Sequence, residues 1–194
     1  MIRKGQEWGV PAPRPAGLVV AATDAELARL VAADPAGVYG LGGGDLHRSL
    51  GSPPQRDEMQ LVPMDALRVR IGDEELLAVA HVVARNGWWR GGVLGVLNSA
   101  YIGDWNVAPR AHPNDGRFDI VEVSPAMSAR QRFQARRRLA AGTHVPHPAI
   151  AVRTATSASW TFDGARDVYV DGVVRGRSSQ LDITIEPDHF AIHI

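Results

Sequence analysis

The sequence contains no cysteine, which excludes disulfide bonds and thiolate metal sites. It carries no net charge, because 21 lysines and arginines balance 21 aspartates and glutamates, so no overall field favours nucleic acid. It also lacks an apolar run long enough to span a bilayer, and its N-terminus lacks the apolar segment of a signal peptide. We therefore predict a cytoplasmic protein that does not bind nucleic acid, and the low net charge is compatible with self-association.

The 194 residues, of which 45% are hydrophobic, can form one domain or two small ones. Residues 1–17 are rich in proline and are predicted to be an extended arm. Apolar runs at 17–21 and 38–41 predict two short strands, each followed by a helix. Thr23 and Glu26 have the spacing of a capping box at the start of the first helix. Asp45 is the candidate N-cap of the second.

Beyond a linker-like segment at residues 51–57, the pattern becomes mostly β. One helix, which residues 124–128 open, continues to about Ala141 and is rich in arginine. Apolar and alternating runs predict strands at 67–71, 76–83, 93–101, 118–123, 150–153, 157–162, 167–170, 180–185 and 189–194.

Residues 107–121 combine two apolar flanks with a rigid polar middle. Pro109 and Pro113 cannot lie inside a central strand or a helix, and Asn114-Asp115-Gly116 has the chemistry of a tight turn. The pattern predicts strand, ordered loop and strand. The loop either supports itself or presents Asp115 and several carbonyl oxygens to a cation.

Four segments together resemble the diacylglycerol kinase and bacterial lipid kinase family. They are Asn98–Gly116, Gly42–Gly51, Gly142–Pro148 and Val170–Gly176. The resemblance extends from about residue 18 to residue 194. It implies an α+β, mainly β fold: an antiparallel β-sandwich with one helix, preceded by a small βαβα stub. The implied domains are a truncated α/β stub of a nucleotide domain (1–53) and a lipid-kinase-like sandwich (54–194).

The resemblance also implies site residues. Gly42, Gly43, Gly44 and Asp45 would lie at the rim of a nucleotide cleft, although a tight strand-to-helix turn explains them as well. Asp171 would be the general base, although the Asp-Gly pair is also typical of a plain hairpin turn. The family's glutamate in that hairpin is replaced by valine.

A structural Mg²⁺ is the one cofactor that the resemblance implies. The Asp115 side chain and the main-chain carbonyls of His112 and Arg117 would hold it, since hard oxygen ligands suit this ion. His144 and His147 stand in a further matching segment, but without additional ligands they do not predict zinc. Imidazoles that cap helix carbonyls are the favoured interpretation of these two residues.

The family's glycine-rich phosphate loop is absent. Residues 22–26 read Ala-Thr-Asp-Ala-Glu, in which only Asp24 matches and Glu26 adds a negative charge where phosphates would lie. ATP binding is therefore not expected. The first hypothesis is a degenerate, non-catalytic lipid kinase homologue that binds a lipid or a protein partner. The second is an active diacylglycerol kinase that uses ATP and Mg²⁺, with a partner chain or with other nucleotide contacts. The third is a subunit that dimerises through its sandwich face.

The arginine-rich helix and Trp88-Trp89 suggest a peripheral membrane location. The arginines could bind anionic lipids, or they could form a solvated face with Phe133 and Leu139 turned inward. The tryptophans could enter a lipid interface, or they could be buried at the edge of the sandwich.

Overall fold

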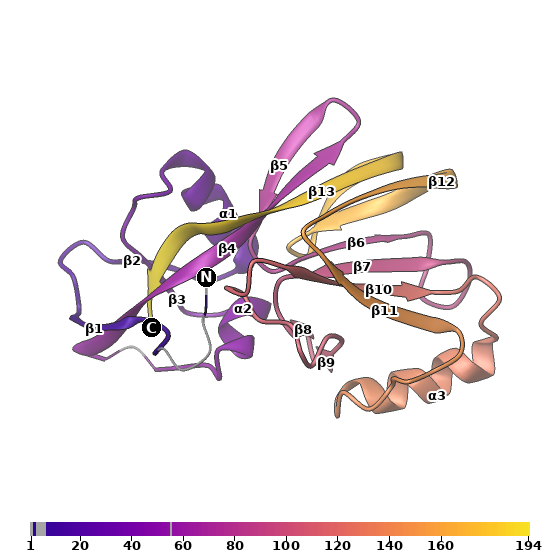
Figure 1. The fold of residues 1–194 in the computed structure, drawn as a ribbon, viewed down its shortest axis with the longest axis horizontal. Helices are drawn as coiled ribbons and strands as arrows, with labels where there is room; N and C mark the ends of the chain where they lie inside the picture. The colour runs from indigo at the N-terminus through magenta and orange to yellow at the C-terminus, as the bar shows by residue number, and fades with distance from the viewer. Residues whose placement is uncertain (1, 3–6, 55) are drawn as a thin grey trace.

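The computed structural model describes residues 2, 7–54 and 56–194, so parts of the predicted arm (1–17) and linker (51–57) lie outside the described residues. Within the described part, one eleven-stranded sheet dominates, and a two-stranded ribbon and three helices accompany it. Figure 1 shows the sheet folded into two layers, with α3 beneath one of them. The strands are β1 (Val10–Pro13), β2 (Val19–Ala21), β3 (Tyr39–Leu41), β4 (Glu58–Ile71), β5 (Glu74–Ala78), β6 (His81–Arg85), β7 (Val93–Leu97), β8 (Tyr101–Ile102), β9 (Trp105–Asn106), β10 (Phe118–Val123), β11 (Ile150–Ala155), β12 (Ser157–Val170) and β13 (Val173–His193).

The predicted fold class is confirmed, since the chain is mainly β and the long strands pair antiparallel. The main path of the sheet runs β1-β4-β13-β12-β6-β7-β10-β11. Apolar side chains from both layers meet in one core, which includes Leu67, Val82, Phe118 and Ile183. Burial of such a continuous apolar surface is the main force that holds two packed layers together.

Strand β1 lies in the predicted arm and pairs with β4, and after it the elements follow the predicted order of strand, helix, strand and helix. The helices are α1 (Asp24–Ala33) and α2 (Gly44–Ser49). Helix α1 begins at Thr23, whose hydroxyl accepts from the backbone N–H of Glu26, as the capping-box spacing predicts. The Glu26 carboxylate accepts from the N–H of Ala22, one residue earlier than a capping box requires.

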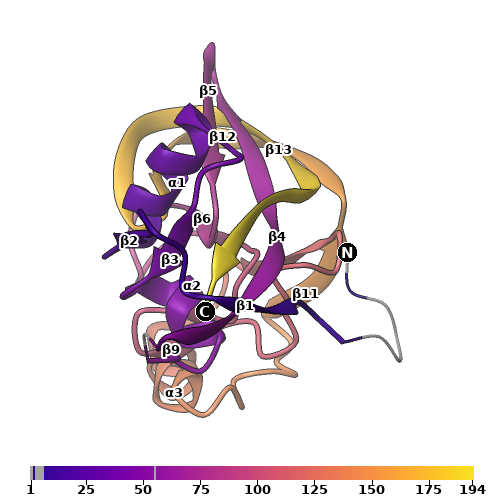
Figure 2. The same ribbon diagram turned by 90° about the vertical axis from the view of Figure 1, so that its left-hand side faces the viewer.

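The N-terminal elements and the sheet share a second core. Leu27 of α1, Leu41 of β3 and Leu46 of α2 are buried against Met64 of β4 and Phe190 of β13. Strand β3 pairs parallel with both β2 and the end of β13 (Figure 2). The division at residue 53 stays a prediction, and these contacts join its two sides.

Several predicted strands are parts of longer ones. The runs at 157–162 and 167–170 belong to β12, and those at 180–185 and 189–194 belong to β13. Register shifts within these strands explain the error, because a β-bulge breaks the side-chain alternation while the backbone stays extended. Conversely, the run at 76–83 divides into β5 and β6.

Helix α3 (Ala129–Leu139) begins with a full capping box between Ser128 and Gln131. The predicted inward position of Phe133 is wrong, because its side chain is 53% exposed. Arg132 is buried instead, at 6% exposure. Among the described residues, no helix is long and apolar enough to cross a membrane.

Candidate functional site

The glycines before α2 bring the helix N-terminus against the carboxylate of Asp24. The backbone N–H groups of Asp45 and Leu46 donate to its two oxygens, at 2.5 and 3.1 Å. A side chain on Gly44, which has φ +96°, would collide with this carboxylate. The predicted N-cap role of Asp45 is wrong, because Gly43 is the N-cap residue and Asp24 supplies the acceptor.

Asp45 faces the neighbouring loops instead of its own helix. One carboxylate oxygen accepts from the N–H of Gly103 at 2.7 Å, and the other lies 3.5 Å from Nδ1 of His81. Burial raises the pKa of Asp45, and the His81 charge opposes that shift. Burial lowers the pKa of His81, which is 3% exposed.

Asp171 lies in the turn between β12 and β13, with φ +47°, followed by Gly172 at φ +80°. The sequence-derived hairpin is therefore confirmed. The carboxylate is buried and accepts from the N–H groups of Val79, Ala80 and His81 at 2.9 to 3.0 Å. Burial raises the pKa of Asp171 to about 6 despite these three donors. The predicted general base is thus directed at the protein backbone.

Three carboxylates from three distant segments interact electrostatically. Burial is the first cause that raises the pKa of Asp24 to about 7, and the Asp171 and Asp45 charges add to it. The sequence interpretation singled out Asp45 and Asp171 but gave no role to Asp24 or to His81. The sequence held one indication of a role for Asp24, since it is the one residue of the segment 22–26 that matches the family's phosphate loop.

The loop of the predicted Mg²⁺ site is organised by its own hydrogen bonds. Asp115 accepts from the N–H of Arg117 at 2.9 Å, and Nδ1 of His112 accepts from the N–H of Asn114 at 3.2 Å. Asp65, a fully buried carboxylate that the sequence interpretation missed, accepts from Gly116 N–H at 2.7 Å.

The same Asp65 carboxylate also accepts from the N–H of Asp188 and from the Asn114 amide. Hydrogen-bond donors therefore surround the Asp65 carboxylate. The oxygen ligands left for a cation are the Asp115 carboxylate and two main-chain carbonyls. Within residues 2, 7–54 and 56–194, no three His, Asp or Glu side chains gather in a metal-binding group. This set is a poor fit to a hard divalent ion, so we derive no role for one, and the site stays a prediction.

An apolar cavity of about 320 Å³ lies between α3, the loop 86–92 and the sheet strands β7 and β10. Trp88 packs edge-on against Trp105, with ring centroids 5.2 Å apart. Arg136 lies over the rings of both Trp89 and Trp105, at 5.6 Å from each centroid. The apolar lining includes Trp88, Ile102, Trp105, Val121, Met127 and Leu139. The cavity includes neither Asp45 nor Asp171.

Arg132 and His144 are the buried polar residues of this lining. Burial lowers the pKa of each. The predicted imidazole caps are wrong for His147, which accepts from Ala149 N–H instead. Backbone N–H groups of Gly142 and Thr143 bond the last carbonyls of α3. A second cavity of about 330 Å³ opens at the end of the sandwich beside Trp160 and Phe162.

Comparison with known proteins supports the resemblance described above. Residues 64–194 match the family described as the YegS C-terminal NAD kinase beta sandwich-like domain. Two solved structures assigned as diacylglycerol kinases of Bacillus anthracis str. Sterne superpose with TM-scores of 0.67 and 0.62, at 12% and 13% identity. Both superpositions cover 90% of this chain, and 77% and 75% of the other. No curated protein matches the chain.

Proposed function

The chain belongs to the family of the YegS C-terminal NAD kinase beta sandwich-like domain, and from that premise we propose a lipid-kinase-like protein that binds a lipid without transferring phosphate. The fold is diacylglycerol kinase-like over most of its length. The proposed ligand is a lipid acyl chain, and the proposed location is peripheral to a membrane.

One observation carries the non-catalytic part of the proposal: protein carboxylates already occupy the backbone donors beside the glycine turn. Glu26 accepts from Ala22 N–H at 2.8 Å, and Asp24 accepts from the first N–H groups of α2. A helix N-terminus binds phosphate through such free donors. A triphosphate here would have to displace two carboxylates and would be repelled by them.

The buried position of Asp171 supports the same conclusion. A general base needs a carboxylate within hydrogen-bond reach of the substrate hydroxyl. Asp171 is 7% exposed, and three backbone N–H groups occupy most of its roughly four acceptor positions.

The apolar cavity supports lipid binding. Its volume of about 320 Å³ lies at the lower end of the usual range for small-molecule sites, and its lining is mostly aromatic and aliphatic. These features suit a single hydrocarbon chain, which needs dry walls and few polar partners.

Phosphoryl transfer is tested by titrating the protein with ATP and Mg²⁺ in a calorimeter and by a radiolabel-transfer assay on diacylglycerol. The proposal expects no saturable ATP binding and no labelled product. Saturable binding that disappears in Asp45→Ala, together with turnover, would overturn it.

Lipid binding is tested by titration with dioctanoylglycerol while tryptophan emission is recorded, because Trp88, Trp89 and Trp105 all line the cavity. Ala135→Phe fills the cavity from α3 and is expected to abolish the spectral change. Gln134→Phe adds the same ring at an exposed neighbouring position and serves as the control. Equal binding by both variants would contradict the assignment of the cavity.

Active phosphoryl transfer is the second candidate function, because one feature favours it. Asp24 and Asp171 have raised pKa values, of about 7 and about 6, near those of working general bases. This function would require the turn to open and the carboxylates to turn toward substrate. Label transfer that rises with pH through this range and is lost in Asp171→Asn would support it.

A further inference from the structure

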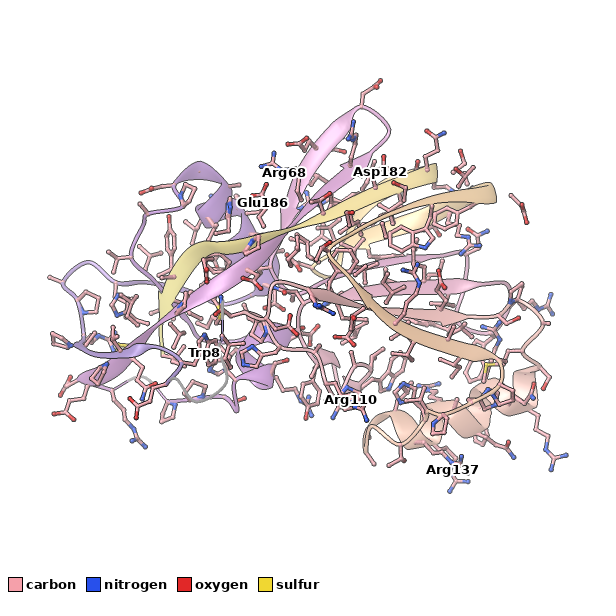
Figure 3. All side chains as sticks on the ribbon, viewed as in Figure 1. Trp8, Arg68, Arg110, Arg137, Asp182 and Glu186 are labelled. Carbon is pink, nitrogen blue, oxygen red and sulfur yellow. The ribbon has the colours of Figure 1, made fainter. Side chains whose placement is uncertain are left out.

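Positive charge is concentrated in one part of a chain whose total charge is zero. From Val123 to Phe162 the sequence has no aspartate or glutamate, and five of its arginines lie on α3. Arg130, Arg137 and Arg138 are exposed, and within the described part of the chain none of them forms an ion pair. Arg137 points away from the protein in Figure 3. The overall balance of charge therefore conceals a strongly basic patch.

Helical spacing divides α3 into an inner and an outer face. Arg132, Ala135 and Leu139 line the cavity, whereas Arg130, Phe133 and Arg137 recur at the spacing of the opposite face. Phe133 is 53% exposed between two arginines. A large aromatic ring in water among cations is not what a simple solvated helix face requires.

The loop 86–92 adds a second exposed aromatic residue to this surface. The Trp89 side chain is 44% exposed, and Arg136 of α3 lies over its ring. The guanidinium of Arg132 ties the loop to the helix, because it donates to the carbonyls of Trp88 and Gly91. It also donates to the carbonyls of Met127 and Ser124, at 3.0 Å each.

The aromatic residues and the arginines are therefore presented by a rigid, preformed unit, and binding would cost little ordering of the backbone. Trp89 and Arg136 are also the exposed members of the cavity lining, so the cavity reaches the surface beside them.

We propose that the outer face of α3, together with Trp89, docks on bilayers that contain anionic phospholipid. Phe133 and Trp89 enter the interface between headgroups and acyl chains, and Arg130, Arg137 and Arg138 contact lipid phosphates. The inference deepens the proposed function, since Trp89 belongs both to the docking surface and to the exposed part of the cavity lining. The docking surface itself does not depend on what the cavity holds.

A bilayer fits this surface better than a nucleic acid does. Nucleic acid binding is driven by phosphate contacts and needs no apolar insertion. Here the two most exposed aromatic side chains, Phe133 and Trp89, lie beside arginines, and Trp89 also lines the cavity.

Flotation with vesicles tests the inference, using phosphatidylcholine alone and phosphatidylcholine mixed with phosphatidylglycerol, over a series of salt concentrations. The protein is expected to float with the mixed vesicles only and to be released by salt. The double variant Arg130→Gln, Arg137→Gln is expected to lose about fivefold in partitioning for each arginine removed. Phe133→Gln is expected to weaken partitioning without changing its salt dependence.

The double variant Arg29→Gln, Arg56→Gln removes the same charge from exposed positions outside this surface and is the matched control. The inference would be overturned if the protein bound both vesicle types equally. It would also be overturned if the control lost as much partitioning as the α3 variant, or if the α3 variant lost none. Binding to duplex DNA as tight as binding to vesicles, and indifferent to Phe133→Gln, would overturn it as well.

Ala135→Phe separates this inference from the proposed function. If the wild type and Ala135→Phe both bind vesicles while dioctanoylglycerol binds neither of them, then the cavity assignment fails and the docking surface stands. If dioctanoylglycerol binds but vesicles do not, then the docking surface fails alone.

Discussion

Buried charged side chains with backbone partners shape the interior of this protein. Asp24, Asp65 and Asp171 each accept at least two backbone N–H bonds, and Arg132 donates only to backbone carbonyls. Such residues satisfy loops that could not otherwise be buried. They are specific but electrostatically costly, which makes them sensitive to pH and to substitution.

Asp24 is expected to make stability depend on pH. Its pKa is about 7 in the folded protein and near the ordinary 3.8 when unfolded. A raised carboxyl pKa means that the folded state holds the proton more tightly. The contribution of Asp24 to the free energy of unfolding is therefore full below about pH 4 and is lost as pH rises to about 7. Asp171 and Asp119 act in the same direction, since burial raises the pKa of each to about 6.

Urea unfolding at pH 4.5 and at pH 7.5 measures this effect. The Asp24→Asn protein is expected to lose about 3 kcal/mol of the change in unfolding free energy between these two pH values, because an amide does not titrate. Glu26→Gln is the control, and an unchanged pH slope in Asp24→Asn would contradict the assignment.

Arg132→Met is expected to destabilise the protein by about 3 kcal/mol, although methionine fills similar space. The reason is that four buried or half-buried carbonyls lose their charged donor. Arg137→Met, on the exposed face of the same helix, is expected to change stability by less than about 0.5 kcal/mol. Equal effects in thermal unfolding would show that Arg132 is not structural.

At the scale of elements, the turn between β3 and α2 depends on two glycines and a distant carboxylate. Gly43 and Gly44 allow the chain to approach Ala22 and Asp24 closely. The result is a short helix whose N-terminus is held by α1, across 21 positions of sequence. This turn is the part of the molecule where phosphate binding was predicted and where the packing opposes it.

Replacing glycine by alanine at two positions separates backbone strain from this contact. Gly44 and Gly51 both have left-handed backbone, at φ +96° and +84°, but only Gly44 faces Asp24. Gly51→Ala is expected to lower the free energy of unfolding by about 1 kcal/mol, and Gly44→Ala is expected to lower it by about 3 kcal/mol. In a double-mutant cycle with Asp24→Ala, the excess cost at Gly44 should largely disappear. An additive cycle in urea unfolding would contradict the contact.

At the scale of the whole molecule, one apolar core joins the N-terminal elements to the sheet. The core that joins them contains Leu27 and Leu46 from the first fifty residues and Val62 and Ile192 from the sheet. Surfaces of this kind do not separate without exposing apolar area to water.

The chain is therefore expected to unfold in one cooperative transition. Leu27→Ala in α1 and Ile183→Ala in β13 should each lower the free energy of unfolding in that single transition by about 2–5 kcal/mol, because both residues are fully buried. Far-ultraviolet circular dichroism and tryptophan fluorescence should report the same midpoint in every protein. Two separated transitions, of which Leu27→Ala moves only one, would show that the parts fold independently.

The local features of this fold could be predicted because they depend on neighbouring residues. The start of α1 at Thr23 and the hairpin turn at Asp171-Gly172 follow from short-range hydrogen bonds and backbone preferences. The strand 118–123 was predicted with its observed bounds. The bulged strands were not, because continuity there comes from pairing with a partner strand.

The sequence alone therefore determined the family resemblance, the fold class and the alternation of strands and helices from Val19 to Ser49. Only the tertiary structure decided that Asp24 caps α2. It also decided that Arg132 lies on the buried face of α3 and Phe133 on the exposed face, and that an apolar cavity lies between this helix and the sheet. The physical reason is distance along the chain. A carboxylate finds its N–H donors, and an arginine its carbonyls, only after remote segments have packed together, and no local pattern of residues records that outcome.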